Sequence, residues 1–199
     1  MNALKLVRLT AWGAITVITA ALLYVLLSPR DAEQGTGVAA VGGPFRLATH
    51  DGRVISNEDL KGRPFALFFG FTHCPDICPT SMLEITNDMN ALGAAGRDFR
   101  VYFVTVDPAR DTAELLKDYL GSFDPRILGL IPKDEAELAN IARAYRAIYR
   151  KVETPSGYTM DHTASIYLMD GKGQFFGTLD SLETPETRQA KLKRLLARG

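Results

Sequence analysis

Cysteine is scarce in this chain, whose 199 residues contain only Cys74 and Cys78. Two cysteines form at most one disulfide, which excludes the multiply bridged scaffolds that small secreted proteins use in place of a large core. A spaced pair instead indicates redox or metal chemistry. A structural disulfide is the alternative, but a bridge between residues this close in sequence would restrict little unfolded-chain entropy.

Histidine is also scarce, with three residues in the chain, and the formal net charge is zero. The first 30 residues hold three basic residues and no acidic residue, so the remainder carries a net charge of −3. Because basic residues do not outnumber acidic ones, nothing in the sequence indicates binding to nucleic acid. The length and the 46% hydrophobic content suit one well-buried domain plus an extra segment.

Charge is absent altogether from Leu9 to Ser28, LTAWGAITVITAALLYVLLS. About twenty apolar residues at 1.5 Å per residue can cross a hydrocarbon core of about 30 Å, so we predict a transmembrane helix. A cleaved signal peptide is the alternative, but the apolar run is too long and no small-x-small cleavage site follows. Lys5 and Arg8 precede the span and favour a cytoplasmic N-terminus.

The chain accordingly divides into three predicted parts. Residues 1–30 form the cytoplasmic N-terminus and the single transmembrane anchor. Residues 31–43 are polar, contain four glycines and are expected to be a flexible linker. Residues 44–199 form the folded domain, on the outer side of the membrane.

The two cysteines directly follow a strongly apolar stretch, Phe65 to Phe71. A run without polar alternation is typical of a central strand that is buried on both faces of an α/β sheet. Pro79 suits the first position of a helix, so both thiols should lie at or just before a helix N-terminus. That position lowers a thiol's pKa and favours the thiolate, which attacks disulfides and binds metals.

The remaining elements are predicted from hydrophobic spacing and turn signals. Met82 and Met89 could suggest copper ligands, but their helical spacing with Ile85 and Leu92 favours a core face. The other predicted elements are a hairpin of 45–48 and 53–55, a helical turn at 57–60, a strand at 101–106, a helix capped by Asp111 with Leu115, Leu116 and Tyr119 in the core, a strand at 126–130, a helix with Leu138, Ile141, Ala142, Tyr145 and Ile148 in the core, a hairpin of 164–169 and 174–178, and a last helix from Pro185.

This order is an N-terminal hairpin followed by β-α-β-α-β-α-β-β-α. Alternating strands and helices that end in a hairpin and a helix indicate an α/β protein with an extended thioredoxin-like fold.

The cysteines are separated by three residues, one more than in the redox motif C-x-x-C, and the wider loop lets two sulfurs face one ion. His162 precedes the strand at 164–169, in the turn that lies against the active-site cysteines of thioredoxin-like folds. It could complete a Cys2His site with Asp161 as a supporting partner, or it could be a surface residue. His73, next to Cys74, is an awkward and less favoured ligand. Thiolates with an imidazole suit Cu(I), Cu(II) or zinc.

Three segments together closely resemble the Sco/SenC family of membrane-anchored copper chaperones. They are FGFTHCPDICP from Phe69 to Pro79, VDPARDT from Val106 to Thr112, and Asp161-His162-Thr163 with Tyr167-Leu168. The resemblance spans roughly Gly42 to Phe176. It departs from the family at Ile131-Pro132, where members commonly have Thr-Gly, and at Gly171, where proline is common.

The resemblance implies a thioredoxin-like domain that binds one copper ion through Cys74, Cys78 and His162. It implies assistance in assembling the CuA centre of cytochrome c oxidase subunit II, with copper supplied by a donor protein. Such a chaperone is not primarily an enzyme. With the predicted topology, it implies a bacterial inner membrane protein with a periplasmic domain, a mitochondrial inner membrane being the alternative.

Other functions share these residues. A thiol-disulfide oxidoreductase could use Cys74 and Cys78 to reduce the cysteines of a copper acceptor. Three features argue against this as the sole role: the wide cysteine spacing, the histidine, and the absence of the proline that thioredoxin-like folds usually carry in the turn at His162. A thiol peroxidase would need a Pro-x3-Thr/Ser-x2-Cys environment, which Leu67 and Phe71 do not provide. A copper-responsive regulator would need the same ligands as a chaperone.

Overall fold

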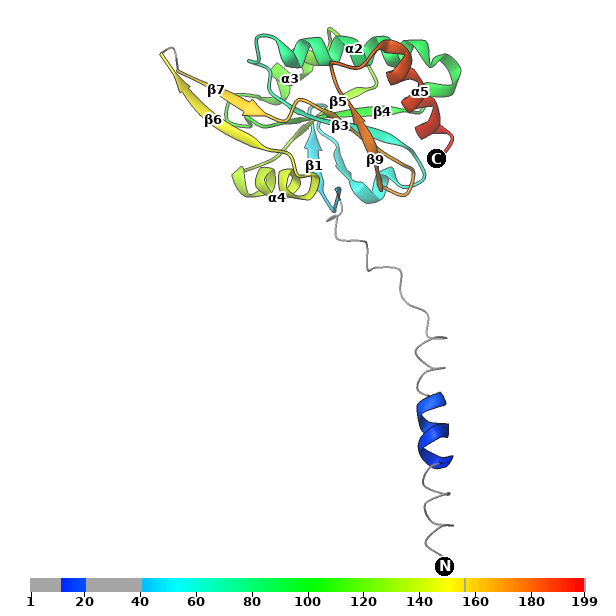
Figure 1. Ribbon diagram of the computed structural model, residues 1–199. Coiled ribbons are helices and arrows are strands. Elements are labelled where there is room, and N and C mark those ends of the chain that lie inside the picture. Colours follow the sequence, from blue (N-terminus) through cyan, green and yellow to red (C-terminus); the bar gives the residue numbers. More distant parts are fainter. Residues whose placement is uncertain (1–11, 21–40, 156, 199) are drawn as a thin grey trace, which may run out of the picture. The chain divides into compact units, whose positions relative to one another are not determined.

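The computed structural model describes residues 12–20, 41–155 and 157–198 (Figure 1). Residues 12–20, inside the predicted span of Leu9 to Ser28, are helical. Among the described residues, no helix is long and apolar enough to cross a membrane. The rest of the predicted span and residues 31–40 of the predicted linker lie outside the described residues. The anchor and the linker therefore stay predictions.

The described part of the folded unit contains a seven-stranded mixed sheet in the order β2-β1-β5-β4-β3-β8-β9. The three inner strands β3, β4 and β5 are parallel, whereas β1 and β8 run antiparallel to their inner neighbours. The strands are β1 (Arg46–Thr49), β2 (Val54–Ser56), β3 (Phe65–Gly70), β4 (Arg100–Thr105), β5 (Ile127–Ile131), β8 (Ile166–Met169) and β9 (Phe175–Leu179).

Helices cover both faces of this sheet (Figure 1). On one face lie α2 (Ile77–Ala91), α3 (Ala113–Leu120) and α5 (Pro185–Leu196), and on the other lies α4 (Glu135–Tyr145). Every residue of β3 is buried, as its unbroken apolar sequence predicts for a strand enclosed on both faces. The mixed α/β, thioredoxin-like prediction is confirmed.

Most of the predicted elements are present. The N-terminal hairpin is β1–β2, the helical turn is the 3-10 helix Asn57–Leu60, and the later hairpin is β8–β9. Pro185 opens α5 at its first position, as predicted. Met82 and Met89 are fully buried in the core, which confirms the packing interpretation of the methionines.

The helix after the cysteine loop begins earlier than predicted. Its first residue is Ile77, so Pro79 is the third helical residue and Cys78 lies within the first turn. The prediction erred because proline is tolerated throughout the first turn, where backbone N–H groups have no intrahelical partner. Cys74 remains in the loop before the helix.

The predicted N-cap of α3 is also wrong. The cap is Thr112, whose side chain accepts a hydrogen bond from the backbone N–H of Leu115. Asp111 is fully buried and serves another purpose, described below. Of the predicted core residues of this helix, Leu116 is buried and Tyr119 packs partly buried against the core, whereas Leu115 is exposed. Leu120, one turn after Leu116, is buried on the same face.

The predicted core position Ile148 is wrong, since its side chain is 74% exposed. The helix α4 ends at Tyr145 because Arg146 adopts a left-handed conformation, with φ of 54°. The chain then enters a two-stranded antiparallel ribbon, β6 (Tyr149–Thr154) with β7 (Gly157–His162), which the sequence analysis missed. This ribbon, hereafter the β6–β7 ribbon, projects from one side of the folded unit (Figure 1).

Candidate metal centre

The sheet brings the two cysteines and His162 together at the carboxyl end of β3. Cys74 and Cys78 follow the carboxyl end of β3. The strand β8 runs antiparallel to β3, with Leu67 opposite Tyr167. The residues that precede β8 therefore lie near the carboxyl end of β3. His162 is the last residue of β7, just before β8. The predicted proximity is correct, although the histidine closes a strand rather than occupying a simple turn.

Cys74, Cys78 and His162 form a compact group among the described residues. One ligand atom from each lies within 4.8 Å of the other two. The Nε2 atom of His162 is 3.3 Å from the sulfur of Cys78, and the backbone N–H of Cys78 donates to the sulfur of Cys74 at 3.4 Å. Both cysteines are free thiols, with Cys78 buried and Cys74 half-buried.

The imidazole of His162 is held in one orientation. Its Nδ1 lies 3.0 Å from the carbonyl oxygen of Thr163, which can only accept, so Nδ1 carries the proton. Nε2 is therefore the ring nitrogen left to bind a metal, and it faces the sulfur of Cys78. The rings of Phe68 and Phe71 contact the imidazole in near-perpendicular arrangements, with centroids 5.9 and 5.8 Å away. This tautomer is the one that a metal ligand needs.

The two thiols differ in acidity. The hydrogen bond from Cys78 lowers the pKa of Cys74 to about 5, aided by backbone N–H donors of the loop and opposed by burial. The same hydrogen bond and the burial of its sulfur raise the pKa of Cys78 well above the ordinary range of a thiol. At neutral pH, the pair therefore holds one thiolate at Cys74 and one proton at Cys78.

The three donor atoms fit a single small metal ion. Bonds of about 2.3 Å to sulfur and about 2.0 Å to nitrogen, the lengths typical of zinc, place neighbouring ligand atoms about 3.5–4 Å apart in a trigonal site. The separations here, none above 4.8 Å, need only small side-chain adjustments to meet this. Two sulfurs and one nitrogen favour copper or zinc over magnesium or calcium, which prefer oxygen.

A buried carboxylate fixes the cysteine loop. Asp111 accepts hydrogen bonds from the backbone N–H of Thr72 at 3.0 Å and from its hydroxyl at 2.6 Å. The Oδ2 atom that accepts from the N–H of Thr72 also accepts from the hydroxyl of Thr105 at 2.6 Å, at the end of β4. The loop that carries Cys74 is thereby tied to the neighbouring strand through a group with no solvent exposure. This role explains why Asp111 is not the helix cap.

A second cluster holds the strand that carries His162. The guanidinium of Arg110 stacks 3.7 Å from the ring centroid of Tyr158 and donates to its carbonyl oxygen at 3.0 Å. Arg110 also pairs with Asp107, to which the Tyr158 hydroxyl donates at 3.0 Å. These contacts join β7 to the loop after β4, so the VDPARDT segment positions both halves of the site.

Asp161 and His73 do not take part in the Cys74–Cys78–His162 group, which contradicts the supporting role suggested for Asp161 and agrees with the low ranking of His73 as a ligand. Asp161 does not support His162; its carboxylate pairs with Arg150 across the β6–β7 ribbon at 2.6 Å, because neighbouring residues of a strand point to opposite faces. His73 is exposed, with Nδ1 3.7 Å from Asp111, and does not belong to the Cys74–Cys78–His162 group. The sequence analysis missed the supporting roles of Arg110, although the resemblance to the family included this residue.

Comparison with known proteins agrees with this geometry. A family model described as SCO1/SenC matches residues 33–197. The chain is 39% identical over 141 residues to SCO1 homolog 1, mitochondrial, from Arabidopsis thaliana, covering 70% of this chain and 42% of that protein. It is 32% identical over 192 residues to SenC of Rhodobacter capsulatus, covering 92% and 86%. The chain thus spans half or less of the length of the first mitochondrial relatives that it matches.

Solved structures give the same result. The structure of Bradyrhizobium japonicum ScoI, which has copper bound, is 46% identical, with a TM-score of 0.72. The match covers 78% of this chain and 99% of that protein. Copper-bound relatives thus share this fold, in which the chain assembles a Cys-Cys-His group.

Proposed function

This chain belongs to the SCO1/SenC family, and we propose that it is a copper chaperone that binds one copper ion through Cys74, Cys78 and His162. The observation that carries the proposal is the group of two sulfurs and one imidazole nitrogen within 4.8 Å, already in the tautomer that a metal requires. The thiolate at Cys74 is available at neutral pH, and Cys78 releases its proton when the ion binds.

We further propose that the copper is delivered to the CuA centre of cytochrome c oxidase subunit II after loading by a donor protein. The transmembrane helix predicted at Leu9 to Ser28 would anchor the chain in a bacterial inner membrane, with the domain in the periplasm. Three ligands suit delivery, because a three-coordinate ion retains room for an incoming ligand from the acceptor. Copper is the cargo here and not a resident catalyst.

A thiol-disulfide reductase is the second candidate function, favoured by the low pKa of Cys74 beside Cys78. In that reaction, the Cys74 thiolate attacks an acceptor disulfide to form a mixed disulfide and releases one acceptor thiolate. Cys78 then loses its proton and attacks Cys74, which frees the second acceptor thiol and leaves a Cys74–Cys78 disulfide. This chemistry needs no imidazole ligand.

The deciding experiment is therefore His162→Ala, with His73→Ala as the matched control on the neighbouring exposed histidine. For a chaperone, His162→Ala weakens Cu(II) binding more than Cu(I) binding in an anaerobic titration, because Cu(II) favours nitrogen. It also impairs CuA assembly under copper limitation, while His73→Ala leaves both unchanged. Normal oxidase activity with His162→Ala would favour the reductase instead.

Oxidation gives a second test. A Cys74–Cys78 disulfide offers no thiolate, so treatment with diamide, which takes up the two electrons and two protons, should abolish copper binding. Dithiothreitol should restore it. Undiminished copper affinity in the oxidised protein would contradict the proposed ligands.

A further inference from the structure

The two ends of the sheet differ in charge. The candidate copper ligands lie at the carboxyl end of β3. The parallel strands β3, β4 and β5 begin together at the opposite end, where Phe65 lies beside Arg100 and Val101 beside Ile127. In Figure 1, the β6–β7 ribbon and the C-terminal end of α5 lie on opposite sides of the folded unit.

Four segments meet where the parallel strands begin. The turn after β8 lies beside the residues that precede β3, since the backbone N–H of Gly62 donates to the carbonyl oxygen of Gly171 at 2.7 Å. The C-terminal end of α5 joins them, because Leu196 lines a cavity together with Arg63 and Phe99. The surface that these segments form, hereafter the amino-end face, consists of residues 62–64, 96–100, 170–174 and 193–198.

The amino-end face is strongly basic. It holds seven basic and two acidic residues, a net charge of +5. Residues 41–199 as a whole hold 20 basic and 21 acidic residues, so the rest of the folded unit carries −6. The charged residues of the face are Arg63, Arg97, Arg100, Lys172, Lys193, Arg194 and Arg198, with Asp98 and Asp170.

Neighbouring groups leave this positive charge in place. Lys61 with Glu58 and Arg126 with Asp124 form ion pairs that cancel. Asp59 is a further carboxylate of this region, and counting it leaves a net charge of +4. Within the described residues, none of the seven basic side chains forms an ion pair, and six of the seven residues are exposed.

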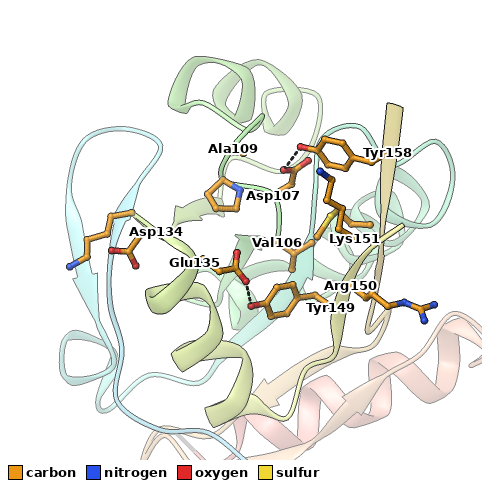
Figure 2. Close-up of a pocket in the computed structure, with 12 residues that line it drawn as sticks. Val106, Asp107, Ala109, Asp134, Glu135, Tyr149, Arg150, Lys151 and Tyr158 are labelled. Atoms are coloured by element: carbon orange, nitrogen blue, oxygen red, sulfur yellow. Dashed lines mark hydrogen bonds between the residues drawn. The ribbon is translucent and has the colours of Figure 1, made fainter. Parts of the chain in front are cut away.

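The carboxyl end of the sheet offers no such excess. A pocket of about 710 Å³ lies there, between the β6–β7 ribbon, the loop after β4 and the start of α4 (Figure 2). Its lining carries three basic and three acidic residues, which balance. They are Lys133, Arg150, Lys151, Asp107, Asp134 and Glu135. Attraction of an anionic surface is therefore concentrated at the amino-end face.

The amino-end face also has room for a small anionic group. Its cavity of about 440 Å³ falls within the range of about 300–1,000 Å³ that is usual for ligand sites. The lining combines the guanidinium of Arg63 with the apolar side chains of Pro64 and Leu196, and Asp98 is its one carboxylate. Cationic groups beside apolar side chains suit the headgroup region of a bilayer, where phosphates adjoin the first apolar groups.

The chain enters the folded unit beside this face. Gly42 lies against the side chain of Met169 and the carbonyl oxygen of Gly173, in the 170–174 turn. Only twelve residues, 29–40, separate Val41 from the predicted transmembrane span. Twelve residues reach at most about 40 Å when fully extended. The predicted anchor therefore keeps the entry point, and the basic face beside it, within that distance of a lipid surface.

We propose that the amino-end face binds the surface of a bilayer that contains anionic phospholipids, with its guanidinium and ammonium groups on the lipid phosphates. The inference rests on the transmembrane anchor of the proposed function for the presence of the bilayer. The six residues of β3 span about 20 Å between this face and the cysteine loop. Docking thus turns the Cys74–Cys78–His162 group away from the lipid, toward the aqueous side where a copper acceptor can reach it.

The first test places the full-length chain in nanodiscs of phosphatidylcholine alone or of equal parts of phosphatidylcholine and phosphatidylglycerol. Acetylation by sulfo-N-hydroxysuccinimide acetate, measured by mass spectrometry, reports the accessibility of each lysine. We expect the reporter lysines of the face, Lys172 and Lys193, to react at least about threefold more slowly on the anionic discs, and added salt to remove the difference. Lys133 and Lys151, at the carboxyl end, should react equally on both.

Two outcomes of this test would overturn the proposal. Equal rates for the reporter lysines on both kinds of disc would do so, because protection that needs no anionic lipid reflects tethering alone. Slower reaction of all four lysines on the anionic discs would do so as well, since it would show binding without preference for the amino-end face.

The second test reverses two charges of the face with Arg63→Glu and Arg97→Glu together. The matched control is Lys117→Glu with Arg143→Glu, two exposed positions in α3 and α4 outside the face. We expect the first pair to abolish the lipid-dependent protection of the reporter lysines and the control pair to retain it, with circular dichroism confirming that both stay folded. Equal loss of protection in both pairs would show an effect of net charge alone and overturn the proposed face.

Copper titration and gel filtration separate this proposal from the proposed function. If the unmodified chain binds no copper but the reporter lysines are protected on anionic discs, the chaperone function fails and the lipid-binding face stands. If copper binds normally and the reporter lysines are not protected, the chaperone function stands and the face is wrong. If the chain leaves phosphatidylcholine discs during gel filtration but stays on anionic ones, the predicted anchor is wrong and the face stands.

Discussion

The two halves of the metal centre are held in different ways. The cysteines follow β3, a strand with every residue buried, and their loop is fixed by the fully buried Asp111. His162 closes a two-stranded ribbon that has no fully buried residue and, in the described chain, pairs with no other strand. Two-stranded ribbons have little stability of their own, so the histidine half depends on the contacts of Arg110 and Tyr158.

This difference bears on the proposed chaperone function, in which the bound ion has to be released. Local opening of a weakly held element costs less free energy than opening of a core element. We therefore expect the β6–β7 ribbon to open before the core does, which would withdraw His162 while the two sulfurs keep their places. In the proposed chaperone, we expect the cysteine half to secure the ion and the histidine half to yield first. Changes to each half should consequently have different effects.

The largest effect is expected from removing both sulfurs. Cys74→Ser with Cys78→Ser leaves one imidazole, which cannot retain a copper ion alone, so bound copper should be lost after dialysis. Metal analysis gives the measurement, and far-UV circular dichroism confirms that the domain stays folded. Zinc should be measured in parallel, because it accepts the same ligands. Stoichiometric copper in the double variant would rule out this site.

The next largest effect concerns the anchor of the cysteine loop. Asp111→Ala leaves the N–H of Thr72 and the hydroxyl of Thr105 without their acceptor, which should lower the unfolding free energy by about 2–4 kcal/mol. Asp118→Ala, an exposed position of α3, is the control and should cost less than about 0.5 kcal/mol. Urea unfolding measures both. Equal stability of the two variants would show that Asp111 does not anchor the loop.

The same contrast explains how much could be predicted from the sequence. The buried strand β3, the cysteine loop and the core methionines were predicted because a hydrophobic pattern reports an element with a buried face. The β6–β7 ribbon was missed because its strands have no fully buried residue. Pro155 and Gly157 mark its turn and were the available signal.

The site was predicted only in part for a related reason. Cys74, Cys78 and His162 were identified from residue type and from the family resemblance. The use of Asp111 as an anchor rather than a cap could not be predicted, because an aspartate before a helix satisfies either role in the sequence. Its hydrogen bonds to Thr72 and Thr105 depend on the pairing of β3 with β4, which is a tertiary contact.

A smaller effect is expected in the acidity of the thiols. With its pKa at about 5, Cys74 is a thiolate at pH 7, and it becomes protonated only as the pH falls through about 5. Alkylation by iodoacetamide should therefore be nearly independent of pH above about pH 6 and should decline below it. Cys78, buried and with a raised pKa, should react at least about tenfold more slowly.

Cys78→Ala sharpens this test. It removes the thiol that donates to Cys74, so the alkylation midpoint should move upward, toward the ordinary thiol pKa of about 8.5. Mass spectrometry of peptides identifies which cysteine has reacted. A midpoint near 8.5 in the unmodified protein, or an unchanged midpoint in Cys78→Ala, would contradict the assigned cause.

The smallest effect is expected in the histidine half. Tyr158→Phe removes the hydrogen bond to Asp107 but keeps the ring on which Arg110 stacks, so it should lower the unfolding free energy by only about 1 kcal/mol. Because β7 is then held less firmly, Cu(II) affinity should fall by up to about fivefold, and Cu(I) affinity should fall less, since Cu(I) depends more on the sulfurs. Tyr102→Phe, a buried tyrosine of β4 away from the ribbon, is the control and should leave the ratio of the two affinities unchanged. A uniform loss for both oxidation states in Tyr158→Phe would place its effect on the cysteine half and contradict the division of the centre into a fixed and a yielding part.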